Sequence, residues 1–336
     1  MSQFRQDNIT KQWVLIAPKR ALRPEGLNTE RAMPDDLPEV DTLCVFCPGN
    51  EKLTTELLLA IPNEKNWRVR VISNKFETLS HKLAKPLDVG RDDFYLTRPG
   101  VGDHEVIILR SHNKPLALQS DEDVLAGIKA WHARMVTLAD HAEVRYTHII
   151  QNHGKLSGAT VQHPHFQLFT VPFIPDHLAD ELEGSASYFR HSGKCVYCEM
   201  IDRELKAGSR VVLDHEDYLV FCLFASRVPF QLRIIPKRHH ASFTDIDTSS
   251  QKSLAKVLKH TLSRIYHKLN NPSYNFYIHT VPICQPKPAY CDPVSYHWHL
   301  EVLPRLNVWA GFELGTEIYV NPVAPEEAAA LLRGKF

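Results

Sequence analysis

The stretch "HPHFQLFTV" at residues 163–171 decides how this chain can fold. Its two histidines, His163 and His165, stand two residues apart at the start of a strand-like run. Side chains along a strand repeat with a period of two, so both imidazoles are expected to point to the same face. The segment "YHWHLEVLP" at residues 296–304 repeats the His-x-His pattern. This recurrence suggests that one structural unit occurs twice in the chain.

The repeat extends on both sides of the two histidine pairs. In each half a Cys-x-x-Cys pair comes first, then strand-like runs and a further histidine, then an amphipathic helix, and last the His-x-His strand. The order predicts an α+β fold with two tandem units at 1–175 and 195–336, joined by a linker at 176–194. Each unit is expected to be a mostly antiparallel sheet with one amphipathic helix.

The helix of the first unit has a clear start and one apolar face. Ser120 can cap it, with Asp123 three residues further on. One face carries apolar side chains at helical spacing, namely Val124, Ile128, Trp131, Met135 and Leu138. The second unit has its helix over 250–269, at the same place in the repeat.

Composition excludes several classes of function. The 336 residues contain 39 Lys plus Arg and 39 Asp plus Glu, so no net field favours a nucleic-acid backbone. No apolar run approaches the roughly 20 residues that span a bilayer, and the start "MSQFRQDNITKQ" lacks the apolar region of a secretory signal. We therefore expect a cytoplasmic protein without a nucleic-acid or membrane partner. In that reducing compartment the 7 cysteines are expected to be free thiols, with metal binding as their leading use.

Two sets of metal ligands follow from the repeat. Structural zinc takes four tetrahedral N or S ligands, and a Cys-x-x-Cys pair plus two distant histidines supplies such a set in each half. The first set is Cys44, Cys47, His112 and His163, and the second is Cys195, Cys198, His239 and His297. His239 is preferred to His240 because it follows "PKR" at a strand end. The alternative is that the cysteines are small buried apolar residues, and the second set could also hold iron. Cys222, Cys284 and Cys291 belong to no such pattern.

If the first histidine of each pair binds metal, His165 is left free beside the loop 152–162, whose small residues and backbone amides can cradle a phosphate. A neutral imidazole can attack phosphorus, with its other ring nitrogen held by an acceptor, expected to be a carbonyl within 152–162. Gln167 shares the face of His165 and can donate to a phosphate oxygen, which favours group transfer over hydrolysis. The alternative is an ordinary pair of surface or core histidines. His299 and Glu301 occupy the equivalent positions in the second half, where a carboxylate would repel phosphate.

Several motifs together resemble one family. They are "RQDNITKQWVLIAPKRALRP", "CVFCPGNE", "RVRVISNKFETL", "GDHEVII", "NHGKLSGATVQHPHFQ", "SRVPFQLRIIPKRH", "YHWHLEVLPR" and "GFELGTEIYVNPVAPEEAA". The chain resembles the galactose-1-phosphate uridylyltransferases, a duplicated branch of the histidine-triad superfamily, over nearly its full length. The resemblance implies two histidine-triad-like units and a ping-pong reaction. His165 takes UMP from UDP-glucose and releases glucose 1-phosphate, and galactose 1-phosphate then removes the UMP as UDP-galactose.

The resemblance also implies roles for individual residues. Arg20, Arg23 and Asn74 would contact the nucleotide, and Asn152, Gly158 and Thr160 the phosphates. Without the resemblance, the two arginines could equally form a solvated basic turn and Asn74 could be a turn former. The segment "GFELGTE" would meet the hexose in the neighbouring subunit's site, which implies a homodimer. Its proposed contact residues are Gly311, Phe312, Glu313, Gly315 and Glu317.

Two other functions stay open at the level of sequence. Relatives with similar endings and both Cys-x-x-Cys pairs include ADP-glucose phosphorylases, which use the same histidine to pass an adenylyl group to inorganic phosphate. The residues do not decide between uracil and adenine. A zinc-stabilised nucleotide-binding protein without chemistry is the third interpretation, and it leaves His165 and Gln167 unexplained.

Overall fold

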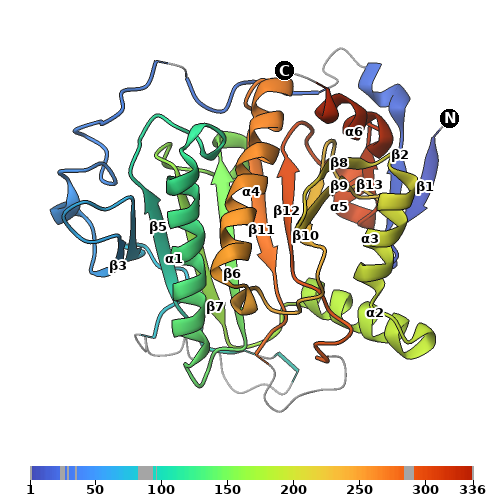
Figure 1. The fold of residues 1–336 in the computed structure, drawn as a ribbon, viewed down its shortest axis with the longest axis horizontal. Coiled ribbons are helices and arrows are strands. Elements are labelled where there is room, and N and C mark those ends of the chain that lie inside the picture. Colours follow the sequence, from blue (N-terminus) through green and yellow to red (C-terminus); the bar gives the residue numbers. More distant parts are fainter. Residues whose placement is uncertain are drawn as a thin grey trace.

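One large sheet runs through both halves of the chain (Figure 1). The computed structural model describes residues 2–22, 27, 28, 30–34, 36–81, 94, 95, 97–283 and 291–334. In this part the sheet has ten strands in the order β3-β4-β5-β7-β6-β11-β12-β10-β9-β8. The strands are β3 (Leu57–Ile61), β4 (Val69–Ser73), β5 (His104–Leu109), β6 (Tyr146–His153), β7 (His165–Val171), β8 (Val211–Asp214), β9 (Tyr218–Cys222), β10 (Leu232–Pro236), β11 (Tyr274–His279) and β12 (His299–Pro304).

The strand order reads the same from both edges, because the second half repeats the first. All neighbouring pairs are antiparallel, and β6 pairs with β11 at the centre of the sheet. Helix α4 (Thr248–Lys268) begins 127 residues after α1 (Asp121–Ala139). The registers keep this spacing, since Val106 lies opposite Gln167 and Arg233 lies opposite Glu301. The mixed α+β fold with two antiparallel halves is therefore confirmed.

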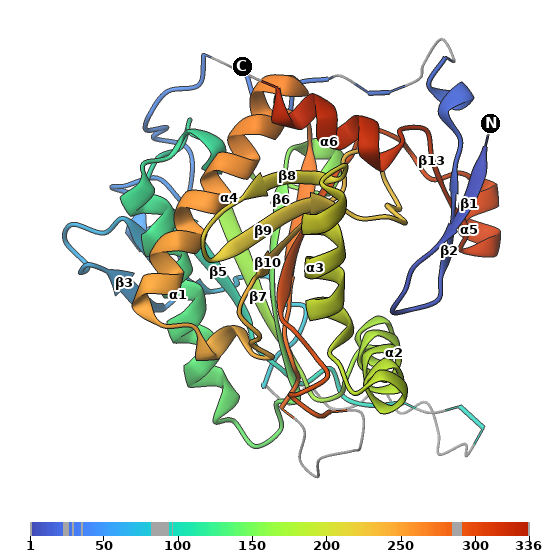
Figure 2. The same ribbon diagram turned by 45° about the vertical axis from the view of Figure 1, so that its right-hand side comes forward.

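Helices α1 and α4 pack side by side on one face of the sheet, as Figures 1 and 2 show. The side chain of Ser120 accepts a hydrogen bond from the backbone N–H of Asp123, so the predicted cap is present. All five predicted apolar residues of α1 are at most 1 % exposed. Trp131 meets the ring of Phe166 edge to face at 4.7 Å, which joins this helix to the strand that carries His165. Packing of α1 thus fixes the position of β7.

The remaining elements surround the second half. They are α2 (Asp176–Ser192), α3 (Val196–Ala207), α5 (Gly311–Thr316), α6 (Pro325–Arg333), and a small sheet of β1 (Gln3–Gln6), β2 (Trp13–Ile16) and β13 (Tyr319–Asn321). Residues 176–194, interpreted from the sequence as a linker, are mostly the helix α2. Its buried stripe is narrow, with Leu178, Leu182 and Ala186 four residues apart, so the apolar pattern is weak. The division into two separate units stays a prediction, because both halves share one sheet.

Among the helices of the described residues, none has the length and apolar composition that crossing a membrane requires.

Candidate active site and metal centres

The first four predicted ligands converge at the start of β7. The Sγ atom of Cys47 lies 3.4 Å from Nδ1 of His112 and 3.6 Å from Nδ1 of His163, and Sγ of Cys44 lies 3.6 Å from Nδ1 of His163. Zinc bonds of about 2.3 Å to sulfur and about 2.0–2.1 Å to nitrogen put S and N about 3.5–3.6 Å apart at the corners of a tetrahedron. The side chains are therefore spaced as ligands of one metal ion.

The protonation of this cluster also suits a cation. The Nε2–H group of His163 donates to the carbonyl of Leu109 at 2.6 Å, so Nδ1 is the unprotonated nitrogen and faces the sulfurs. Burial lowers the pKa of His163 to about 4, which keeps the imidazole neutral. Burial also raises the pKa of the Cys47 thiol to about 11, so a thiolate here needs a positive ion.

The second four predicted ligands also converge. Sγ of Cys198 lies 3.4 Å from Nδ1 of His239 and 3.8 Å from Nδ1 of His297, and all four ligand atoms, including that of Cys195, lie within 4.8 Å of one another. His239 follows His112 by the same 127 residues that separate α4 from α1, which explains why it and not His240 completes the set. Both clusters could hold a metal ion. Bound metal would supply a cross-link between distant segments and no chemistry, because four protein ligands leave no open position.

His165, the predicted nucleophile, is the first residue of β7. Its Nδ1–H group donates to the carbonyl of His163 at 2.8 Å, which leaves Nε2 as the nitrogen with a free lone pair. The acceptor was expected within 152–162, and that expectation is wrong. His163 lies in a bend before the strand rather than on it, and this bend turns its carbonyl toward His165. Burial lowers the pKa of His165, so the ring is neutral at neutral pH.

Gln167 lies two residues further on the same face. Its Oε1 atom is 2.8 Å from Nε2 of His104, the first residue of β5. Asn74, at the end of β4, is also next to His104, with Nδ2 at 3.0 Å from Nε2. His104 did not stand out in the sequence, because only the register between β5 and β7 brings it to Gln167.

The predicted phosphate loop lies between β6 and β7. It contains a short 3-10 turn at Lys155–Ser157, and Gly154 and Gly158 have φ values of 81° and 87°, which a residue with a Cβ rarely adopts. Asn275 of β11 donates to Oδ1 of Asn152 at 2.8 Å and to the Ser157 carbonyl at 2.9 Å. A cavity of about 950 Å³ is lined by this loop, including Asn152, Gly158 and Thr160. Asn275 is a second residue that the sequence did not reveal.

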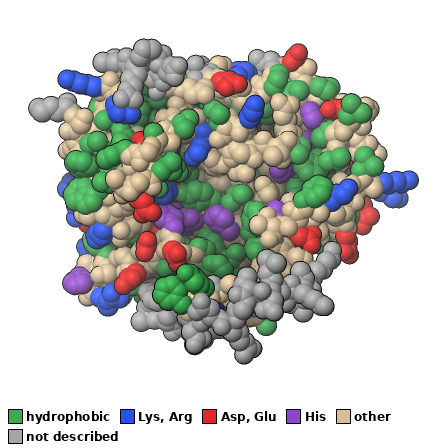
Figure 3. Space-filling view, turned by 180° about the vertical axis from the view of Figure 1, so that it is seen from behind, with side chains coloured by type: hydrophobic (Ala, Val, Ile, Leu, Met, Phe, Trp, Pro, Cys, Tyr) green, Lys and Arg blue, Asp and Glu red, His purple; other side chains and the backbone are tan. Residues whose placement is uncertain are grey.

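Histidines gather in a hollow on the sheet face that α1 and α4 leave open (Figure 3). A cavity of about 610 Å³ on this face crosses the central strands β6 and β11. Asn152 lines both this cavity and the one at the phosphate loop. A ligand at the loop can therefore extend toward the second half.

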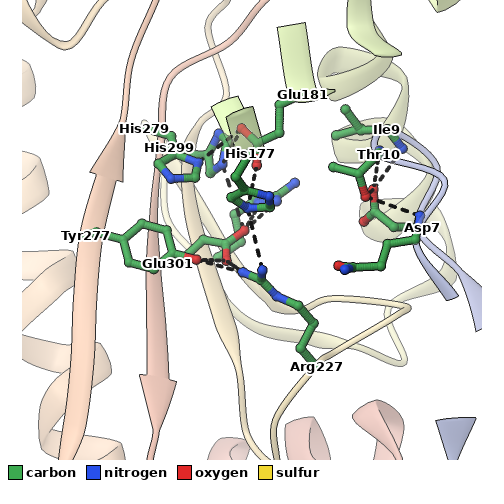
Figure 4. A network of polar contacts seen from close by, with 12 residues as sticks. Asp7, Ile9, Thr10, His177, Glu181, Arg227, Tyr277, His279, His299 and Glu301 are labelled. Carbon is green, nitrogen blue, oxygen red and sulfur yellow. Dashed lines mark hydrogen bonds and ion pairs between the residues drawn. The ribbon is translucent and has the colours of Figure 1, made fainter. Parts of the chain in front are cut away.

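The equivalent site of the second half is closed, as Figure 4 shows. His299 is 0 % exposed and Glu301 2 %. Glu301 accepts hydrogen bonds from four side chains, at distances between 2.5 and 3.4 Å, which belong to Arg227, Gln231, Arg233 and Tyr277. Glu181 of α2 covers His299 and accepts from Tyr296 at 3.0 Å. A phosphate has no room at this position.

Other predicted residues lie elsewhere. Arg20 is exposed in a 3-10 turn, and Arg23 lies outside the described residues. The segment from Gly311 to Glu317 forms α5 and its C-cap beside β13, on the far side of the molecule from β7 (Figures 1 and 2). Glu313 is buried and accepts from the backbone N–H of Ala310 at 3.0 Å, whereas Phe312 is 49 % exposed.

One cysteine differs from the expectation of free thiols. Cys291 is disulfide-bonded, whereas Cys44, Cys47, Cys195, Cys198 and Cys222 are free. Disulfide formation depends on the distance and direction of two Cβ atoms, which cysteine spacing alone does not give.

Comparison with known proteins places the chain in a family. Residues 1–175 match the model of the galactose-1-phosphate uridyl transferase N-terminal domain, and residues 181–333 match that of the C-terminal domain. The chain belongs to the galactose-1-phosphate uridyl transferase family. The predicted resemblance is thus confirmed.

Members of this family with two different names are similar to the chain. It is 32% identical to the ADP-glucose phosphorylase of Arabidopsis thaliana, over 98% of this chain and 92% of that protein. It is 27% identical to the galactose-1-phosphate uridylyltransferase of Thermotoga maritima, over 99% of this chain and 98% of that protein. The crystal structure of the Arabidopsis phosphorylase with bound ADP-glucose superposes with a TM-score of 0.85 at 30% identity, covering 100% of this chain and 99% of that one.

Proposed function

We propose that this protein is a nucleotidyltransferase that exchanges UMP between UDP-glucose and galactose 1-phosphate through a uridylyl-histidine at His165. The observation that carries the proposal is the hydrogen bond from Nδ1 of His165 to the His163 carbonyl, which fixes the tautomer and leaves Nε2 free to attack. A neutral, oriented imidazole needs no separate base to act on phosphorus.

In the first half-reaction, Nε2 of His165 forms a bond to the α-phosphorus of UDP-glucose. The bond from that phosphorus to the bridging oxygen breaks, and glucose 1-phosphate leaves with the bonding electron pair. The ring then carries a positive charge, which the His163 carbonyl stabilises through Nδ1–H. In the second half-reaction, a phosphate oxygen of galactose 1-phosphate attacks the same phosphorus and restores neutral His165.

The phosphate contacts follow from the loop and from Gln167. The amide of Gln167 donates to a nonbridging oxygen, and Asn152, Gly158 and Thr160 surround the phosphates, in line with the cavity at the loop. Asn74, Arg20 and Arg23 contact the nucleotide.

The hexose site is completed by a second subunit. Helix α5 lies on the far side of the molecule from His165, and its Phe312 and Leu314 are 49 % and 71 % exposed. Residues Gly311 to Glu317 of one subunit therefore serve the His165 of its partner in a homodimer.

Both Cys₂His₂ clusters bind zinc in this proposal. Their S–N distances of 3.4 to 3.8 Å support a tetrahedral ion. The second centre, where Cys198 is half-buried and His239 exposed, could hold iron instead.

Transfer of an adenylyl group to inorganic phosphate is a second candidate function. It is favoured by the similarity to the Arabidopsis ADP-glucose phosphorylase over nearly the whole chain. His165 and the phosphate loop would act in the same way on ADP-glucose, so only the base and the acceptor differ.

Intact-mass analysis tests both functions. The protein is mixed with UDP-glucose or ADP-glucose without an acceptor, at mildly alkaline pH where phosphohistidine survives. We expect a uridylyl adduct that galactose 1-phosphate removes and that His165→Ala does not form. An adenylyl adduct removed by inorganic phosphate would assign the second function, and no adduct with either sugar would refute group transfer.

A further inference from the structure

His104 is held tightly between the backbone and Gln167. It is 7 % exposed, and its ring stacks on Phe169 with centroids 4.1 Å apart and planes 25° apart. The backbone N–H of Thr78 points to Nδ1 at 3.1 Å, and Oε1 of Gln167 lies 2.8 Å from Nε2. Both ring nitrogens are thus engaged.

The backbone contact decides the tautomer of His104. An N–H group can only donate, so Nδ1 accepts from Thr78 and carries no proton. Burial lowers the pKa of His104, so the ring is neutral and its single N–H proton is on Nε2. Nε2–H therefore donates, and of its two neighbours only the oxygen of Gln167 can accept. Asn74 faces the same nitrogen with an NH₂ group, and its own Oδ1 accepts from the N–H of Phe76 at 2.8 Å.

This hydrogen bond sets the direction of the Gln167 amide. A glutamine side chain can turn its oxygen or its NH₂ group to either side, because the two ends have almost the same shape. With the oxygen held by His104, the NH₂ group faces away from His104. Those two N–H donors are then available to a phosphate without any reorientation.

The second half contains the same contact with a different acceptor. Gln231 follows His104 by 127 residues, and it donates to Glu301, the counterpart of Gln167, at 2.9 Å. Glu301 has two equivalent oxygens and no donor, so Gln231 has no amide to orient. The orienting effect is therefore confined to the half with the open site.

We propose that His104 is a positioning residue for group transfer, which fixes the Gln167 amide so that its N–H groups point to the transferred nucleotidyl group. The inference rests on the proposed function of His165. His104 itself touches no reacting atom in this proposal.

The experiment measures adduct formation at His165 in a single turnover, together with nucleotide-sugar affinity by calorimetry. His104→Phe keeps a ring that can stack on Phe169 and loses the donor. We expect a rate about 10- to 100-fold lower, the usual effect of losing a group that orients an active residue, with affinity changed less than about threefold. His104→Gln can accept from Thr78 and donate to Gln167, and it should restore most of the rate.

A double variant separates positioning from a merely structural effect. If His104 acts through Gln167, His104→Phe should add no loss to Gln167→Ala, because the amide it orients is already gone. Gln231→Leu is the matched control from the second half. It should lower the thermal midpoint and leave the rate per folded molecule unchanged.

Several results would overturn the inference. A wild-type rate in His104→Phe would remove the positioning role, and so would additive losses in the double variant. If the wild-type protein forms an adduct while His104→Phe does not differ from it, the proposed function stands and only this inference fails. If wild type forms no adduct with UDP-glucose or ADP-glucose, the proposed function fails first.

Discussion

Replacing Glu301 by glutamine should destabilise the protein without affecting its chemistry. Glu301 occupies in the second half the position that Gln167 has in the first, yet it is 2 % exposed and paired with Arg233 and Arg227. The Glu301→Gln variant changes one oxygen to an NH₂ group and keeps the shape. It therefore removes the charge and little else.

The size of the effect follows from the two buried guanidinium groups. Arg233 donates to Oε1 of Glu301 at 2.5 and 3.2 Å, and Arg227 lies 3.4 Å from Oε2. Removal of one partner of a buried ion pair costs about 3–5 kcal/mol, because the remaining charge stays buried without compensation. At about 2 °C for each kcal/mol in a chain of this size, the thermal midpoint should fall by about 6–10 °C.

The pH dependence of this difference checks the cause. Burial alone would raise the pKa of Glu301, but Arg233 and Arg227 outweigh it and hold the pKa well below its usual range. A lowered carboxyl pKa contributes stability in full above the unfolded pKa of about 4.3, and this contribution is lost as pH falls toward the folded pKa. Urea denaturation of wild type and variant should therefore give the same difference in unfolding free energy from pH 8 to pH 5. The difference should shrink only at lower pH.

Adduct formation by folded Glu301→Gln should equal that of wild type. A loss below about 1 kcal/mol would show that the ion pairs contribute little, against the burial argument. A folded variant that forms no adduct would refute the conclusion that only the first half is catalytic.

Three further predictions concern the first half. Gln167→Glu should slow adduct formation by about 10²-fold or more, because a carboxylate repels the phosphate and loses a donor, and single-turnover mass analysis measures this rate. Cys47→Ser should leave one metal ion per chain instead of two by elemental analysis and should lower the thermal midpoint, whereas two ions would contradict the ligand assignment. Because burial lowers the pKa of His165, the rate of adduct formation should stay constant from pH 8 down through 6.5, the pKa of an ordinary histidine; a midpoint at 6.5 would contradict a neutral buried ring.

The repeated pattern predicted most of the fold and both metal clusters. Cysteine and histidine patterns persist through a duplication, so the sets that include His112 and His239 could be found without knowing the contacts. The interpretation of 176–194 failed to find α2, whose buried face is only a narrow stripe of small and apolar side chains. His104 and Asn275 act on the candidate site through strand register and through the pairing of the two halves, which local sequence does not contain.

The pairing of β6 with β11 has a consequence for the chain when it is cut. Four residue pairs join the halves there, from Tyr274 opposite His153 to Tyr277 opposite Ile150. A fragment that ends after β7 would present β6 as an open edge with unpaired backbone groups, and such an edge pairs readily with another strand. Two copies of the first half, placed about the same axis, would meet along β6 in the way that the two halves now meet, with two open His165 sites in place of one open and one closed.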